Sequence, residues 1–62
     1  MTDSELIDEA YGAIVRNLFS NFFHSFTAAL GNPDEEQQAA ELFRKGVMHA
    51  RHVRERALAA LP

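Results

Sequence analysis

Apolar residues recur every three to four positions along two stretches of this 62-residue chain, which are separated by Gly31-Asn32-Pro33. A rotation of about 100° per residue places the apolar positions of each stretch on one side of an α-helix. In the first stretch they are Ile7, Tyr11, Ile14, Val15, Leu18, Phe19, Phe22, Phe23, Phe26 and Leu30. In the second they are Ala39, Leu42, Phe43, Gly46, Val47, Ala50, Val53, Ala57, Leu58 and Leu61. The pattern predicts two amphipathic helices.

Capping signals set the ends of the predicted helices. Thr2 and Glu5 have the spacing of a capping box, so the first helix is expected to start near residue 3. Gly31 suits the left-handed residue that ends a helix. Asn32 can cap the next helix, and Pro33 fits its first position. The chain therefore turns sharply between the two apolar stretches.

A connection this short makes the two helices antiparallel. We predict an all-α fold in one domain, a two-helix hairpin with helices at about residues 3–30 and 33–61. In a hairpin hinged near Asn32, residues whose numbers sum to about 65 face each other. This register places Phe22 opposite Phe43, and it places Phe19 opposite Gly46.

The first helix carries four of the five phenylalanines, and its apolar arc covers more than half of its circumference. One neighbouring helix cannot cover so wide an arc. A chain of this length has little core, and without cysteine it has no disulfide or thiolate zinc site to support it. We therefore predict that two hairpins dimerise into a four-helix bundle. The predicted dimer interface is Tyr11, Val15, Leu18, Phe19, Phe22, Phe23, Phe26, Leu30, Phe43 and Val47.

Two other uses of the phenylalanines remain open: they fill the contact between the two helices of one hairpin, or they form an aromatic pocket that binds a ligand. In length and plan the chain is similar to the small plasmid-encoded Rop-type hairpins. Those proteins dimerise into four-helix bundles and bind paired RNA loops. The resemblance is one of architecture alone, and no functional residue is carried over from it.

Composition places the chain among globular proteins, with 47% apolar residues, 24% charged residues and a net charge of −3. The acidic N-terminus lacks the basic region of a signal peptide. Polar residues interrupt the apolar stretch at 10–30, so a membrane span is not expected. We expect a cytoplasmic protein without a membrane partner.

Charge is segregated along the chain. Acidic residues gather at 1–9 and 34–41, whereas five of the six basic residues lie within 44–56. In an antiparallel hairpin the basic segment lies beside the acidic start of the first helix, and both suit their helix dipoles. Glu41 and Lys45 also have the spacing of a favourable helical pair. The same basic residues permit an RNA-binding surface formed by Arg44, Lys45, Arg51 and Arg56.

Arg54 is exceptional because it falls within the apolar arc of the second helix, opposite Asp8. Two readings are open. Arg54 forms a partly buried ion pair with Asp8, within the chain or across the dimer. Alternatively, its side chain extends past the apolar surface into solvent.

Candidate chemistry is sparse. His49, His52 and Glu55 have the spacing of a surface zinc or nickel site, but these histidines fall on the polar side of their helix. The Glu-x-x-His unit of di-iron bundles is absent, and so are HExxH, a Gly-rich phosphate loop and a cysteine nucleophile. We expect no enzymatic activity, no cofactor and no metal.

The function expected from the sequence is that of a homodimeric adaptor or regulator that binds another protein. Met48 falls on the polar side of the second helix, where an adaptable apolar side chain can anchor a partner. The alternatives are a small RNA-binding regulator and an accessory hairpin that docks its phenylalanines on a larger subunit. The predicted partner-binding residues are Arg44, Met48, Arg51, His52 and Glu55.

Overall fold

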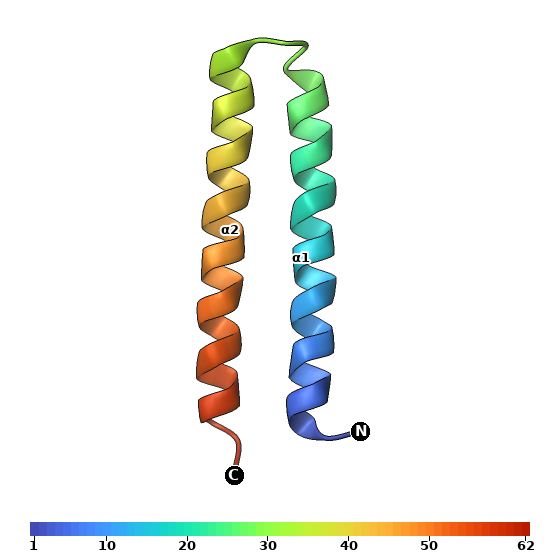
Figure 1. Ribbon diagram of the computed structural model, residues 1–62, viewed down its shortest axis with the longest axis vertical. Helices are drawn as coiled ribbons and strands as arrows, with labels where there is room; N and C mark the ends of the chain where they lie inside the picture. The colour runs from blue at the N-terminus through green and yellow to red at the C-terminus, as the bar shows by residue number, and fades with distance from the viewer.

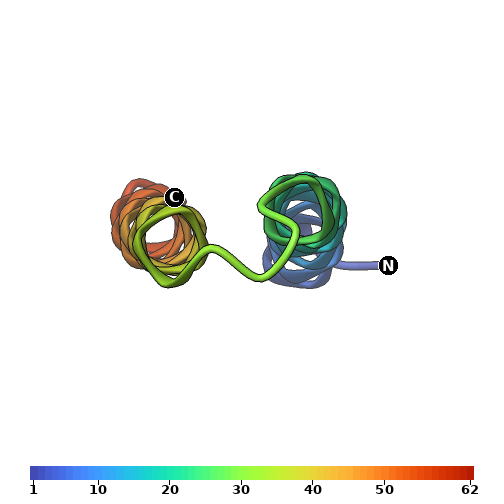
Figure 2. The ribbon, with the colours of Figure 1, turned by 90° about the horizontal axis from the view of Figure 1, so that it is seen from above.

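The computed structural model consists of two α-helices, α1 (Asp3–Ala28) and α2 (Pro33–Ala59), and describes all 62 residues. The helices run antiparallel and lie side by side, with both chain ends at the same end of the molecule (Figure 1). Seen along the helix axes, the two helices form a single layer (Figure 2). The backbone extends 48 × 18 × 7 Å along the three principal axes of the molecule. The predicted all-α hairpin is confirmed.

Both helices begin at the predicted caps. The hydroxyl of Thr2 accepts a hydrogen bond from the Glu5 amide at 3.2 Å, and the Glu5 carboxylate accepts one from the Thr2 amide at 3.2 Å. The side-chain oxygen of Asn32 accepts bonds from the amides of Asp34 and Glu35 at 3.0 and 3.2 Å. These contacts satisfy amides that have no partner within the helix.

The connection is a tight turn from Ala29 to Asn32, closed by a hydrogen bond from the Asn32 amide to the Ala29 carbonyl at 3.0 Å. Its two central residues, Leu30 and Gly31, have φ angles of 52° and 83°, the pattern of a type I′ turn. A left-handed residue cannot continue a helix, so α1 ends at Ala28, two residues before the predicted end. Leu30 therefore lies at the tip of the hairpin, where it is 91% exposed.

The seam, meaning the line of side chains between the two helices, follows the predicted register closely. The rings of Phe22 and Phe43 lie 5.1 Å apart between their centroids, as predicted. Gly46 faces Leu18 rather than Phe19, and a Cβ atom added to Gly46 would lie 2.8 Å from Leu18 Cδ2. One residue turns a helix by about 100°, which rotates Phe19 out of the seam. The glycine lets the helices approach closely here.

The hairpin buries little of its own surface. Only Ala29 and Ala39 are buried, and the accessible surface is 4875 Å². A folded monomer of 7.0 kDa is expected to expose about 4,000 Å². Neither helix combines the length and apolarity needed to cross a membrane. The structure is thus a flat hairpin with an unusually large exposed area.

Candidate interaction surfaces

A single layer of two helices has two broad faces and two outer edges. Ile14 lines a groove on one broad face. Phe19 and Phe23 follow it by five and nine residues, so they are rotated from it by about 140° and 180°. They therefore belong to the opposite broad face, which we call the Phe face and define by Phe19, Phe23 and Phe26.

The Phe face is apolar and open. Phe19, Phe23 and Phe26 are 48%, 58% and 41% exposed. Phe19 meets the seam edge-on, with its ring centroid 6.4 Å from that of Phe43. Phe23 stands farther out, and its ring centroid lies 5.8 Å from that of His24 with the ring planes at 82°. Three exposed phenylalanines on consecutive turns form the kind of patch that marks a protein interface.

The groove on the other broad face has a volume of about 500 Å³ and runs along the open half of the hairpin. Small residues of α2, Gly46, Ala50 and Ala57, line it together with larger side chains. Ile14 of α1 and Val53 of α2 also line it and are 49% and 50% exposed. We call this the groove face. The sequence pattern did not distinguish it from the Phe face, because both lie within one wide apolar arc.

The residues predicted for the dimer interface divide between these surfaces. Tyr11 and Leu18 line the groove, and Phe22 lies in the seam against Phe43. Leu30 lies in the turn, apart from both faces. Phe43 lies in the seam against Phe22. The remaining predicted residues lie on the Phe face or at its border with the seam, and they are Val15, Phe19, Phe23, Phe26 and Val47.

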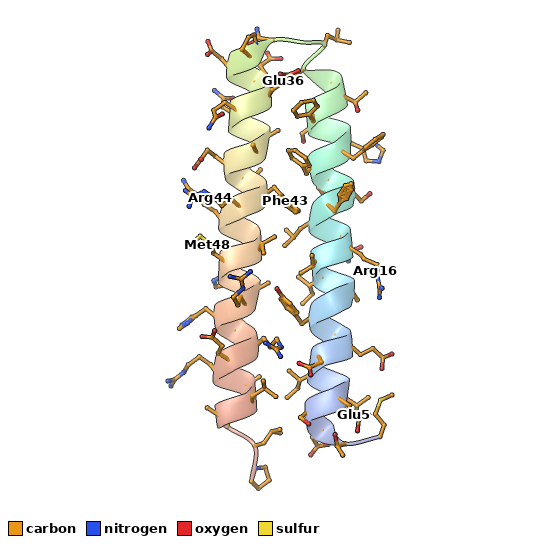
Figure 3. The ribbon with its side chains drawn as sticks, viewed as in Figure 1. Glu5, Arg16, Glu36, Phe43, Arg44 and Met48 are labelled. Carbon is orange, nitrogen blue, oxygen red and sulfur yellow. The ribbon has the colours of Figure 1, made fainter.

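The predicted partner-binding residues form one stripe on the outer edge of α2. Their spacing confines them to an arc of about 100°, which runs from the border of the Phe face at Arg51 to the side of α2 away from α1 at Met48 and His52. All of them are exposed. Figure 3 shows Arg44 and Met48 pointing away from α1 while Phe43 points toward it. We call this surface the outer stripe, and it consists of Arg44, Met48, Arg51, His52 and Glu55.

Arg44 is held in place within the outer stripe. Its Nη2 donates to Glu41 Oε2 at 3.0 Å, and its Nη1 lies 3.6 Å from Met48 Sδ. The hydrogen bond from Arg44 lowers the pKa of Glu41, with a smaller contribution from the charge of Arg44, and the pair raises the pKa of Arg44. Glu41 thus pairs with Arg44 and forms no ion pair with Lys45, the partner expected from the sequence.

Arg54 makes the long-range ion pair that was one of the two readings of its position. Its Nε donates to Asp8 Oδ1 at 2.6 Å, within one chain. Its guanidinium carbon also lies 5.5 Å from the centroid of the Tyr11 ring, in cation–π geometry. The cluster ties the two helices together in the open half of the hairpin.

The other basic residues do not form one continuous surface. Arg44 and Arg51 lie toward one side of the outer edge of α2, whereas Lys45 and Arg56 are rotated from them by about 100° and 140°. Met48 lies between the two pairs. Arg44 is already paired with Glu41, which leaves its charge partly neutralised.

The histidines of α2 do not gather with other metal-ligating side chains. No group of three or more histidine, cysteine, aspartate or glutamate side chains is gathered closely enough to hold a metal ion. His49 and His52 are separated by about 60° around the helix, and His49 lies at the groove.

Neither a protein-family model, nor a curated protein, nor a solved structure matches this chain.

Proposed function

We propose that this protein is a non-enzymatic homodimer of helical hairpins that binds another protein as an adaptor or regulator in the cytoplasm. The large solvent-accessible surface of the hairpin is the observation that supports this proposal. The hairpin exposes 4875 Å², against about 4,000 Å² expected for a monomer of its mass. Its exposed surface includes three phenylalanines on one face. Association is the most direct way for a chain without disulfides to cover this surface.

The partner at the Phe face is a second copy of the chain. A face of 48 × 18 Å has an area of about 860 Å². Two copies packed face to face would bury at most roughly 1,700 Å² in total, and covering most of the face reaches the range of about 1,200–2,000 Å² typical of stable interfaces. A two-fold axis brings the same patch of each copy together and completes a four-helix bundle.

Met48, His52 and Glu55 of the outer stripe remain exposed in such a dimer because they lie at the edge of the layer, while Arg51 borders the Phe face. Met48 is 55% exposed at its centre, with charged side chains on either side. An apolar anchor surrounded by polar groups is the usual composition of a protein-binding site. The two-fold symmetry presents this stripe twice.

A protein partner is better supported than RNA. An RNA-binding surface needs clustered positive charge, but the basic residues of α2 divide into two separate pairs. Glu55 and Met48 lie between those pairs. A salt titration of binding distinguishes an RNA partner from a protein partner. Contacts with phosphate weaken steeply as the salt concentration rises, whereas contacts through Met48 do not.

Light scattering tests the dimer directly. We expect a mass of about 14 kDa, twice the 7.0 kDa of the chain. Phe23→Glu should give a 7.0 kDa species. The matched control Ile14→Glu places the same charge at a similarly exposed site of the groove face and should remain dimeric. A wild-type chain that stays monomeric and cooperatively folded would overturn the dimer. An aggregating monomer would instead favour docking of the Phe face on a larger subunit.

The outer stripe is tested by comparing identical substitutions on the two helices. Arg51→Ala and Met48→Glu should abolish capture of the protein partner without changing helicity or mass. Arg16→Ala is the control, because Arg16 lies on α1 and points away from α2 (Figure 3). Undiminished capture by both outer-stripe variants would exclude this surface.

A further inference from the structure

We propose that the groove face binds an acidic amphipathic helix from a partner protein. This site goes beyond the proposed function, because it lies on the broad face opposite the Phe face and is separate from the outer stripe. In a dimer formed through the Phe face, both grooves remain open to solvent. The proposal rests on the length, shape and charge of the groove.

The length of the groove matches a short helix. Its lining runs from Ile7 to Leu18 on α1 and from Gly46 to Ala57 on α2. At about 1.5 Å per residue, each wall is about 16 Å long, which corresponds to three helical turns. A partner helix with apolar residues at i, i+3, i+4 and i+7 presents a matching apolar stripe.

The shape of the groove favours close packing of a third helix. Gly46, Ala50 and Ala57 are spaced by four and seven residues, so their small side chains fall on one side of α2. Ile14 and Val53 add apolar surface that is half exposed on either helix. Large side chains of an incoming helix can enter over the small residues, as ridges enter grooves between packed helices.

A helix is favoured over an extended peptide because of the backbone. A peptide that binds as an added β-strand takes its main-chain hydrogen bonds from a sheet edge, and this all-helical chain offers none. A helix satisfies its own backbone groups and requires only side-chain contacts.

The charge of the groove identifies the partner as acidic. His49 lines the groove, and Lys45 and Arg56 lie four residues before and seven residues after it, on the same side of α2. Between Ile7 and Leu18, the corresponding side of α1 carries only alanine and asparagine. One wall is therefore basic and the other uncharged, which complements a helix with glutamate or aspartate beside its apolar stripe.

A second copy of the chain fits this groove less well. It would bring a groove with the same basic wall, and like charges across an interface disfavour the pairing. The Phe face, which offers three exposed aromatic rings, is the better surface for self-association.

Two synthetic peptides test the proposal. Each is a 14-residue helix with leucine at the i, i+3, i+4 and i+7 positions, and the remaining positions are mainly glutamate in one peptide and lysine in the other. Binding to the full chain is followed by fluorescence anisotropy and by methyl NMR. We expect the glutamate peptide to bind at least tenfold more tightly and to shift the methyl signals of Ile14, Ala50 and Val53. The chain has a net charge of −3, so non-specific attraction would produce the opposite preference.

Matched variants separate this site from the dimer. Val53→Glu and Ile14→Glu place a charge on either helix that lines the groove. Each should lower the affinity for the glutamate peptide at least tenfold while the mass and helicity of the protein stay unchanged. Phe23→Glu should abolish the dimer and leave peptide affinity unchanged. Equal affinity for both peptides, or full affinity in both groove variants, would overturn the proposal. So would oleate saturating the same methyl shifts at lower concentration, because the groove would then be a lipid site.

Discussion

Arg54 Nε donates a hydrogen bond to Asp8 Oδ1 at 2.6 Å, which joins two residues 46 positions apart. The small residues along α2 allow the helices to approach, but they specify the alignment of the helices only weakly. The ion pair fixes this alignment in the open half of the hairpin. The contact between the rings of Phe22 and Phe43 fixes it nearer the turn. Together the two contacts oppose sliding of one helix along the other.

A double-mutant cycle with Asp8→Ala and Arg54→Ala measures the strength of this pair. The side chains of Arg54 and Asp8 are 34% and 52% exposed, so solvent screens their attraction. We expect a coupling free energy of about 0.5–1 kcal/mol in urea unfolding, decreasing in 1 M salt. Arg54→Ala alone should cost more than Asp8→Ala, because it also removes the contact with Tyr11. Zero coupling at low salt would contradict a role in alignment.

Replacing each of the two glycines within the helices by alanine is expected to change the stability of the protein differently. Nothing lies within 4 Å of a Cβ atom added to Gly12, whereas one added to Gly46 meets Leu18 Cδ2 at 2.8 Å. Gly12→Ala should raise the free energy of unfolding by about 1 kcal/mol through helix propensity. Gly46→Ala should lose most or all of that gain, because Leu18 must shift. Urea unfolding at one protein concentration measures both, and equal stabilisation would show that the seam is loose at Gly46.

The turn contains a strained residue that can be relieved. Leu30 has a φ of 52° and is 91% exposed, so its side chain makes little contact to offset the strain. Leu30→Gly should stabilise the hairpin by about 1 kcal/mol, because glycine adopts this conformation freely. Gly31→Ala should destabilise it by a similar amount, since Gly31 has a φ of 83°. Thermal unfolding of the two variants should therefore shift in opposite directions.

The Glu41–Arg44 pair should be visible in a pH titration. The Arg44 hydrogen bond lowers the pKa of Glu41 below its ordinary value of 4.5. A lowered carboxyl pKa stabilises the folded state above the unfolded pKa, and that contribution is lost as the pH falls through the folded pKa. In carboxyl NMR, Arg44→Gln should return the Glu41 pKa toward 4.5, whereas Lys45→Gln should change it less. Equal effects of the two variants would contradict the observed pairing.

The sequence was sufficient to predict the hairpin because its signals are local. The caps at Thr2 and Asn32 appear directly in the residue types, and a short link admits only an antiparallel arrangement. The pairing of Phe22 with Phe43 followed from the length of the turn. These features depend on residues that are near one another in sequence or related by simple symmetry of the hairpin.

The features that were missed depend on side-chain geometry. A leucine gives no signal of positive φ, so the end of α1 was placed two residues late. Lys45 and Arg44 have equally suitable spacings from Glu41, and only the side-chain conformations decide between them. The separation of the groove face from the Phe face also required the structure, because a wide apolar arc does not reveal where the second helix divides it.

The backbone of this protein is only 7 Å thick, and this thinness has a consequence for how its sequence can evolve. In a thick globular domain, most apolar substitutions are constrained by an interior that is shared by many neighbours. Here almost every apolar position borders a surface, because only Ala29 and Ala39 are buried, so a single substitution changes the surface more readily than it disrupts the helices. Such a chain can gain or change an interaction surface through a few substitutions while the two helices keep their hairpin arrangement.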